Sequence, residues 1–68
     1  MAEYVTFTLE LESGNAAMVD DPRYAVARLL RQTADRLEEF EESGVLLDEN
    51  GNRVGEWGLD VEEDDNDE

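Results

Sequence analysis

Acidic side chains are the residues of this sequence that could do chemistry. Twenty of its 68 residues are Asp or Glu, five are Arg, and Lys, His and Cys are absent. A pair of carboxylates works as general acid and base only when one of them is desolvated and its pKa is raised. No acid lies inside an apolar run that would bury it, and no His or Lys could activate a serine or threonine. We therefore predict a protein that is not an enzyme, with no catalytic residue and no cofactor.

The segment 48–52 reads Asp-Glu-Asn-Gly-Asn and places oxygen ligands at alternate positions, as a calcium-binding loop does. Such a loop also needs Gly at its sixth position and Glu at its twelfth, where this chain has Arg53 and Leu59. Asn-Gly is instead typical of a tight turn. Without Cys or His the common zinc sites are excluded as well, so we predict no metal site.

The formal net charge of −15 decides which partners are suitable. Nucleic acids and anionic membranes carry the same sign, so neither is an expected partner. A basic protein is the expected partner. The N-terminus lacks the basic and apolar regions of a signal peptide, and no stretch approaches the roughly 18 apolar residues of a membrane span. We expect a cytoplasmic protein.

Residues 4–11 alternate apolar and polar side chains, which predicts a β-strand with one buried face. The set expected to face the core is Val5, Phe7, Leu9 and Leu11, and the opposite face carries Tyr4, Thr6 and Thr8. Residues 12–20 are expected to form a loop.

A helix is predicted over residues 22–42. Asp21 suits the N-cap and Pro22 the first helical position, and Gly44 is the expected residue that ends the helix. Apolar side chains at helical spacing form the face expected to pack on the sheet: Val26, Leu29, Leu30, Leu37 and Phe40.

Residues 45–59 are predicted to form a hairpin around Asn50-Gly51, with Trp57 in the core. A two-residue loop would pair Leu47 with Val54, whereas a three-residue loop ending in a left-handed Gly51 would pair Leu46 with Val54. Residues 60–68 hold seven acids and should form a disordered acidic tail after a domain of residues 1–59.

These elements predict the α+β class, as a small βαββ domain with a three-stranded mixed sheet and one helix packed on one face. The crossover makes the first two strands parallel, and the third strand should lie between them. The helix can cover only one face, so the face with Tyr4 should stay open.

Short motifs along residues 4–57 resemble small orphan βαββ-type proteins of phages, prophages and other mobile elements. The motifs are Asn15-Ala16-Ala17, Asp21-Pro22, Ala27-Arg28-Leu29-Leu30-Arg31, Ala34-Asp35-Arg36-Leu37, Asp48, Asn50-Gly51-Asn52 and Val54-Gly55. The resemblance implies a mobile-element origin and no mechanism. The dense acidity after Leu37 and the acidic tail depart from that pattern.

A cluster of acids lies at the end of the predicted helix. Asp35, Glu38, Glu39 and Glu42 would share one helix face. Four like-charge pairs at these spacings would cost on the order of 1–2 kcal/mol, and the helix dipole adds to that cost. Arg31 next to Asp35 and Arg36 next to Glu39 would offset part of it. We expect these acids, with Tyr4 on the open face, to bind the partner.

Two functions follow from the charge. The first is an acidic, non-catalytic binding protein, such as a mobile-element inhibitor or nucleic-acid mimic, that captures a basic host protein. The alternative is a small structural or interaction domain of a halophilic source, in which the acidity serves solubility only. That domain could form a homodimer through the open sheet face.

Overall fold

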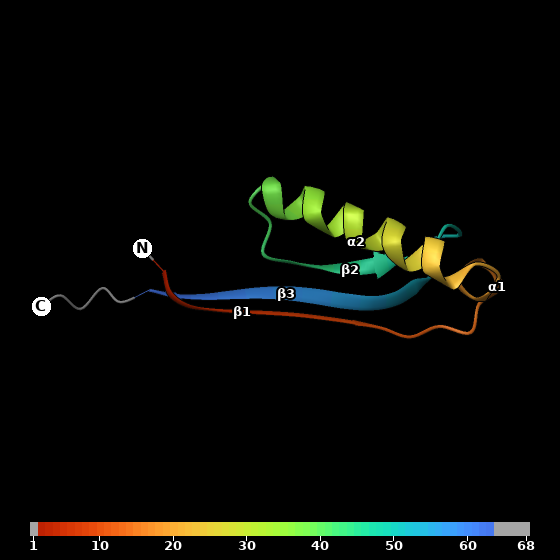
Figure 1. Ribbon diagram of the computed structural model, residues 1–68, viewed down its shortest axis with the longest axis horizontal. Helices are drawn as coiled ribbons and strands as arrows, with labels where there is room; N and C mark the ends of the chain where they lie inside the picture. The colour runs from red at the N-terminus through yellow and green to blue at the C-terminus, as the bar shows by residue number, and fades with distance from the viewer. Residues whose placement is uncertain (1, 64–68) are drawn as a thin grey trace, which may run out of the picture.

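The computed structural model describes residues 2–63, which form one antiparallel sheet and two helices. The elements are β1 (Ala2–Leu11), α1 (Ala16–Val19), α2 (Pro22–Glu38), β2 (Ser43–Leu47) and β3 (Arg53–Glu63). Helix α2 lies on one face of the sheet, and the molecule is elongated, with extents of 54 × 19 × 18 Å (Figure 1). The predicted α+β class, with one main helix on one face of a small sheet, is confirmed.

The strand order is β1-β3-β2, so the third strand lies in the centre as predicted. β3 pairs antiparallel with β1 and with β2. β1 and β2 run in the same direction, but they do not neighbour each other. Within residues 2–63 all neighbouring strands are therefore antiparallel. The prediction of a mixed sheet is wrong in this respect.

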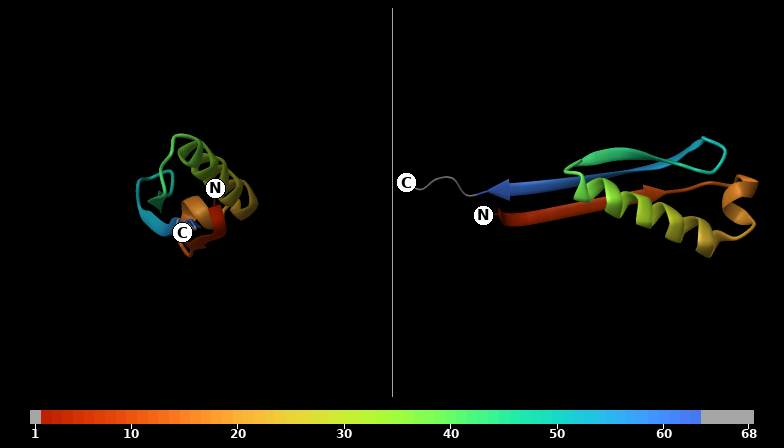
Figure 2. Two further views of the ribbon diagram at one scale, coloured as in Figure 1. Left: turned by 90° about the vertical axis from the view of Figure 1, so that its left-hand side faces the viewer. Right: turned by 90° about the horizontal axis from the view of Figure 1, so that it is seen from above.

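Helix α2 covers only part of the sheet. Its 17 residues span about 25 Å, whereas the 11 residues of β3 span about 37 Å. Figure 1 and the right-hand view of Figure 2 show β1 and β3 continuing together beyond the C-terminal end of α2. Val5 and Phe7 lie on the helix side, opposite Val61 and Leu59, yet they are 55% and 44% exposed. Their predicted burial is wrong because the helix ends before it reaches them.

The length of β3 also corrects the expected start of the acidic tail. Asp60–Glu63 belong to β3 and pair with β1. Residues 64–68 lie outside the described residues.

The core lies between α2 and the part of the sheet that the helix covers. Trp57 is buried as predicted, and the ring of Phe7 packs beside it with 6.2 Å between the ring centroids. The buried apolar side chains are Met18, Ala25, Leu29, Leu46, Val54 and Trp57. Met18 reaches this core from α1, a single helical turn inside residues 12–20, where a loop was expected.

The hairpin between β2 and β3 has a three-residue loop. Asp48 N–H donates to Asn52 O at 2.9 Å, and Gly51 has the positive φ of 84° that this loop requires. The pairing predicted for such a loop, Leu46 with Val54, does not form. Leu47 pairs with Arg53 and Leu46 with Gly55, because a β-bulge leaves Val54 buried and without a pairing partner in β2.

Helix α2 begins as predicted but ends four residues early. Asp21 is the N-cap residue, although its side chain makes no capping hydrogen bond, and Pro22 is the first helical residue. At the other end, Phe40 adopts a positive φ of 70°, its N–H donates to Leu37 O, and Glu41 N–H donates to Arg36 O. These two bonds form a Schellman turn, the usual helix stop, with phenylalanine at the position that normally holds glycine.

Gly44, the expected helix stop, lies in β2 instead. It pairs with Trp57, and a Cβ atom there would come within 2.8 Å of Trp57 Nε1. Phe40, expected in the core, is 93% exposed. The helix therefore ends at an exposed aromatic residue whose backbone conformation is strained.

We predict that Phe40→Gly stabilises the fold by about 0.5–1 kcal/mol. Glycine adopts positive φ without steric strain, and this gain exceeds the added entropy of the unfolded chain. The measurement is urea-induced unfolding followed by circular dichroism. Phe40→Ala is the matched control, since alanine removes the ring but keeps the strained Cβ. A Phe40→Gly variant no more stable than Phe40→Ala would contradict the turn assignment.

Candidate functional site

The acids singled out in the sequence gather around the C-terminal end of α2, but they do not share one helix face. Asp35 and Glu38 are helical, Glu39 is the C-cap residue, and Glu42 follows the Schellman turn. Glu42 O accepts the N–H of Leu59 at 2.8 Å, which directs the chain into β2. The predicted helical pairs of Glu42 with Glu38 and with Glu39 are therefore wrong.

Arginines do not neutralise this cluster. Arg36 Nη1 lies 3.3 Å from Glu41 Oε1 and not beside Glu39, and the expected pair of Arg31 with Asp35 does not form. The other two ion pairs found within residues 2–63 join Arg28 to Glu49 and Arg53 to Glu56. The side chains of Asp35, Glu38, Glu39 and Glu42 are exposed, and they lie at the negative end of the α2 dipole. This end of the molecule thus carries uncompensated negative potential.

Phe40 stands in the middle of these acids, where the sequence did not lead us to expect an exposed aromatic side chain. Glu39 precedes it, Glu41 and Glu42 follow it, and its ring is almost fully in solvent. A bulky residue with positive φ is rare, and such strain is common at functional positions. The available signal was the run Glu-Glu-Phe-Glu-Glu, because like charges three and four residues apart and the helix dipole disfavour a helix that continues through it. We define Phe40 with Asp35, Glu38, Glu39 and Glu42 as the acidic helix end.

Tyr4 does not belong to the acidic helix end. It lies opposite Glu62 on the sheet face away from α2, and it is 64% exposed. Its neighbours on β3 include Asp60, which pairs with Thr6. The five residues expected in one binding site are therefore divided between two faces of the sheet.

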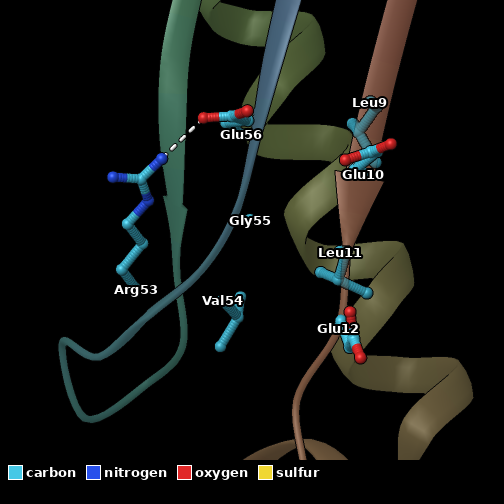
Figure 3. A pocket seen from close by; sticks show the side chains of 8 residues that line it. All are labelled: Leu9, Glu10, Leu11, Glu12, Arg53, Val54, Gly55 and Glu56. Carbon is cyan, nitrogen blue, oxygen red and sulfur yellow. Dashed lines mark hydrogen bonds and ion pairs between the residues drawn. The ribbon is translucent and has the colours of Figure 1, made fainter.

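A broad surface hollow of about 670 Å³ lies where β1 and β3 meet near the hairpin (Figure 3). Glu10 and Glu56 lie directly opposite each other across the strands, and Arg53 Nη2 approaches Glu56 Oε1 at 2.6 Å. The acids that line this hollow, Glu10, Glu12 and Glu56, are all exposed. These three carboxylates are open to water, and among the residues that line the hollow none is a buried acid.

Asp48 is buried and organises the hairpin loop. Its Oδ1 accepts the N–H groups of Asn50 and Asn52, each at 2.9 Å. Its Oδ2 accepts the side-chain amides of Asn15 at 3.0 Å and Asn52 at 3.4 Å. The Asn52 backbone N–H, helped by the other donors, lowers the pKa of Asp48 and outweighs the opposing effect of desolvation.

This arrangement fits a turn and not a calcium loop. Four N–H donors already surround the carboxylate that calcium would need. Among the described residues, no three acidic side chains lie close enough together to hold a metal ion.

Comparison with known proteins finds no match among protein-family models, curated proteins or solved structures. Neither helix in residues 2–63 has the length and apolar character needed to cross a membrane.

We predict that Asp48→Asn destabilises the fold at neutral pH, because an amide at Oδ2 would face the Asn15 and Asn52 amides, which are also donors. The Asp48 pKa is lower in the folded chain than in the unfolded one. Its stabilising effect is therefore full above about pH 4 and is lost as the pH falls through the folded-state pKa.

Urea midpoints at neutral and acid pH test this prediction. The difference between the parent chain and Asp48→Asn should shrink on acidification. Glu12→Gln, a change at an exposed acid that has no ion-pair partner among the described residues, should leave the midpoint nearly constant. A difference that does not change with pH would show that the Asp48 charge has no such role.

Proposed function

We propose that this chain is an acidic, non-catalytic binding protein that captures a basic protein at the acidic helix end. Phe40 supports this proposal most directly, because a strained turn holds its ring in solvent next to four acids that have no ion-pair partner among the described residues. These acids are Asp35, Glu38, Glu39 and Glu42. Aromatic residues often anchor protein interfaces, and uncompensated charge steers an oppositely charged partner toward them.

The chemistry of this site suits an arginine-rich or lysine-rich surface. A guanidinium or ammonium group can lie over the Phe40 ring while its charge meets the neighbouring carboxylates. The long apolar stems of these residues can cover the ring as well. A neutral or acidic partner would gain the ring contact but lose the charge interaction.

The spacing of the acids is compatible with nucleic-acid mimicry, as expected for a mobile-element inhibitor. Asp35 and Glu39 are four residues apart, or about 6 Å along the axis of α2. Two phosphate steps of one DNA strand advance about 6.8 Å. A protein that binds a phosphate backbone through basic side chains could therefore accept this helix end in its place.

Two variants of equal net charge separate a binding site from a general effect of charge. The site variant combines Asp35→Asn, Glu38→Gln, Glu39→Gln and Glu42→Gln. The control variant combines Asp60→Asn, Glu3→Gln, Glu10→Gln and Glu62→Gln, all exposed acids of β1 and β3. The probe is a fluorescent synthetic octa-arginine peptide, and the measurement is fluorescence anisotropy at physiological salt.

The site variant should bind the peptide at least about tenfold more weakly than the control variant does. Phe40→Ala should also weaken binding although it changes no charge. Equal losses in the two charge variants would show that net charge acts without a site, and unchanged binding in the site variant would refute the proposal.

The acids outside the helix end favour a second candidate, a halophilic interaction domain whose acidity serves solubility. Glu10 faces Glu56 across β1 and β3, and Asp60 and Glu62 continue the acidic stripe on the open face. Repulsion of this kind is tolerated best in concentrated salt, where the screening length falls to about 3 Å at 1 M. The same stripe disfavours a homodimer through the open face, because the acids of one copy would lie opposite the acids of the other.

A salt series separates the two candidates. For the binding protein, we expect circular dichroism to show a folded chain in dilute buffer, with moderate further stabilisation as salt screens the acids. A chain that folds only in molar salt would instead support the halophilic domain.

A further inference from the structure

We propose that two copies of this chain associate along the free edge of β1, forming a six-stranded antiparallel sheet with both α2 helices on one face. This inference is independent of the basic partner, because it concerns the opposite kind of surface, one that is apolar and uncharged.

The hydrogen-bond pattern shows which groups of β1 are free. Glu12 N–H donates to Val54 O at 2.9 Å, which sets the alternation of the β1–β3 ladder. In an antiparallel pair, every second residue bonds to the neighbouring strand, and the residues between them point their N–H and C=O groups outward. The even-numbered residues of β1 therefore bond to β3. Val5, Phe7 and Leu9 present their backbone groups at the free edge.

The side chains along this edge do not repel a second copy. Residues 4–9 contain no charged side chain, in a chain whose formal charge is −15. Val5 and Phe7 are about half exposed beside the end of α2. A long, uncharged and apolar edge strand readily pairs with another strand, and this edge lacks the lysine or proline that usually prevents such pairing.

Helix α2 extends this surface on the same face of the sheet. Its flank toward β2 is polar, since Arg28, Gln32 and Arg36 line a hollow of about 260 Å³ there. Its other flank has a shallow apolar hollow of about 460 Å³ that includes Val26 and Leu30, and Leu30 is 48% exposed. Val26 and Leu30 are four residues apart, so they lie next to each other on the surface of α2.

The register of β1 suits a second copy better than an unrelated strand. A two-fold axis at Phe7 pairs Val5 with Leu9 of the partner, so the outward backbone groups of both strands meet. In that register Glu10 lies opposite Tyr4 of the partner and Glu3 opposite Leu11 of the partner. No acid of β1 then faces another acid.

The two-fold axis at Phe7 also fixes how the two α2 helices lie. Glu42 bonds to Leu59, which pairs with Phe7, so α2 ends at the level of the axis and the two helices extend away from it in opposite directions. The exposed Val5 and Phe7 of each copy then lie on the side of the axis occupied by the partner's α2. The acids of residues 35–42 are the helix charges nearest the axis, and the salt of the test screens their repulsion.

Sedimentation equilibrium of the full chain over a concentration series, at physiological salt, tests the proposal with two proline variants. Val5→Pro removes an outward N–H from the β1 edge without breaking a β1–β3 hydrogen bond. Val45→Pro is the matched control. Glu42 O accepts Leu59 N–H, so the ladder alternation turns the Val45 N–H outward at the β2 edge. Circular dichroism establishes that each variant is folded, and Val5→Lys replaces Val5→Pro if the proline variant is not.

The expected result is a dimer for the parent chain and for Val45→Pro. Val5→Pro or Val5→Lys should dissociate at least about tenfold more readily. A parent chain that stays monomeric throughout the series would overturn the proposal. A dimer that survives in folded β1-edge variants, or that is lost in folded Val45→Pro, would overturn it as well.

Discussion

The early end of α2 is the constraint on which the rest of this structure depends. Glu41 N–H returns to Arg36 O, and Phe40 takes a left-handed conformation that few phenylalanines adopt. This turn directs the chain into β2, where Gly44 leaves room for the buried indole of Trp57. The same turn leaves the outer half of the β1–β3 ribbon without a cover, and it holds Phe40 in solvent among acids. Core packing, exposed apolar surface and concentrated charge therefore share one local cause.

The molecule separates two surfaces of opposite character around this helix end. The carboxylates of the acidic helix end have no ion-pair partner among the described residues, and they would attract a basic protein over a long range. The free edge of β1 is uncharged over residues 4–9 and offers backbone groups together with apolar side chains. A domain of this size buries a small core and has little stability to spare. Like-charge crowding and the strained turn at Phe40 both lower that stability, and the proposed capture of a basic protein assigns a role to both.

Short sequence patterns predicted the elements whose conformation depends on neighbouring residues in the chain. The alternation in residues 4–11 identified β1, Asp21-Pro22 identified the start of α2, and Asn50-Gly51 identified the hairpin loop. The end of α2 was not predictable in this way, because the apolar spacing continues through Phe40 and no glycine marks the turn. The bulge at Val54 and the position of Met18 depend on packing against α2, which acts across the fold. The four acids were predicted to share one helix face, but Glu42 lies beyond the turn that ends α2. Tyr4 was grouped with these acids although the sheet separates them.

The conformation of Phe40 tests this account most directly, and NMR spectroscopy of the labelled chain measures it. A positive φ brings the amide proton of a residue close to its own α proton and gives a strong intraresidue NOE. The account predicts that NOE at Phe40, with helical Cα shifts that stop at about Glu38. Helical shifts that continue without interruption to Glu42, with an ordinary negative φ at Phe40, would contradict it. In that case the acids would lie along one regular helix face, and the exposed aromatic anchor would not exist.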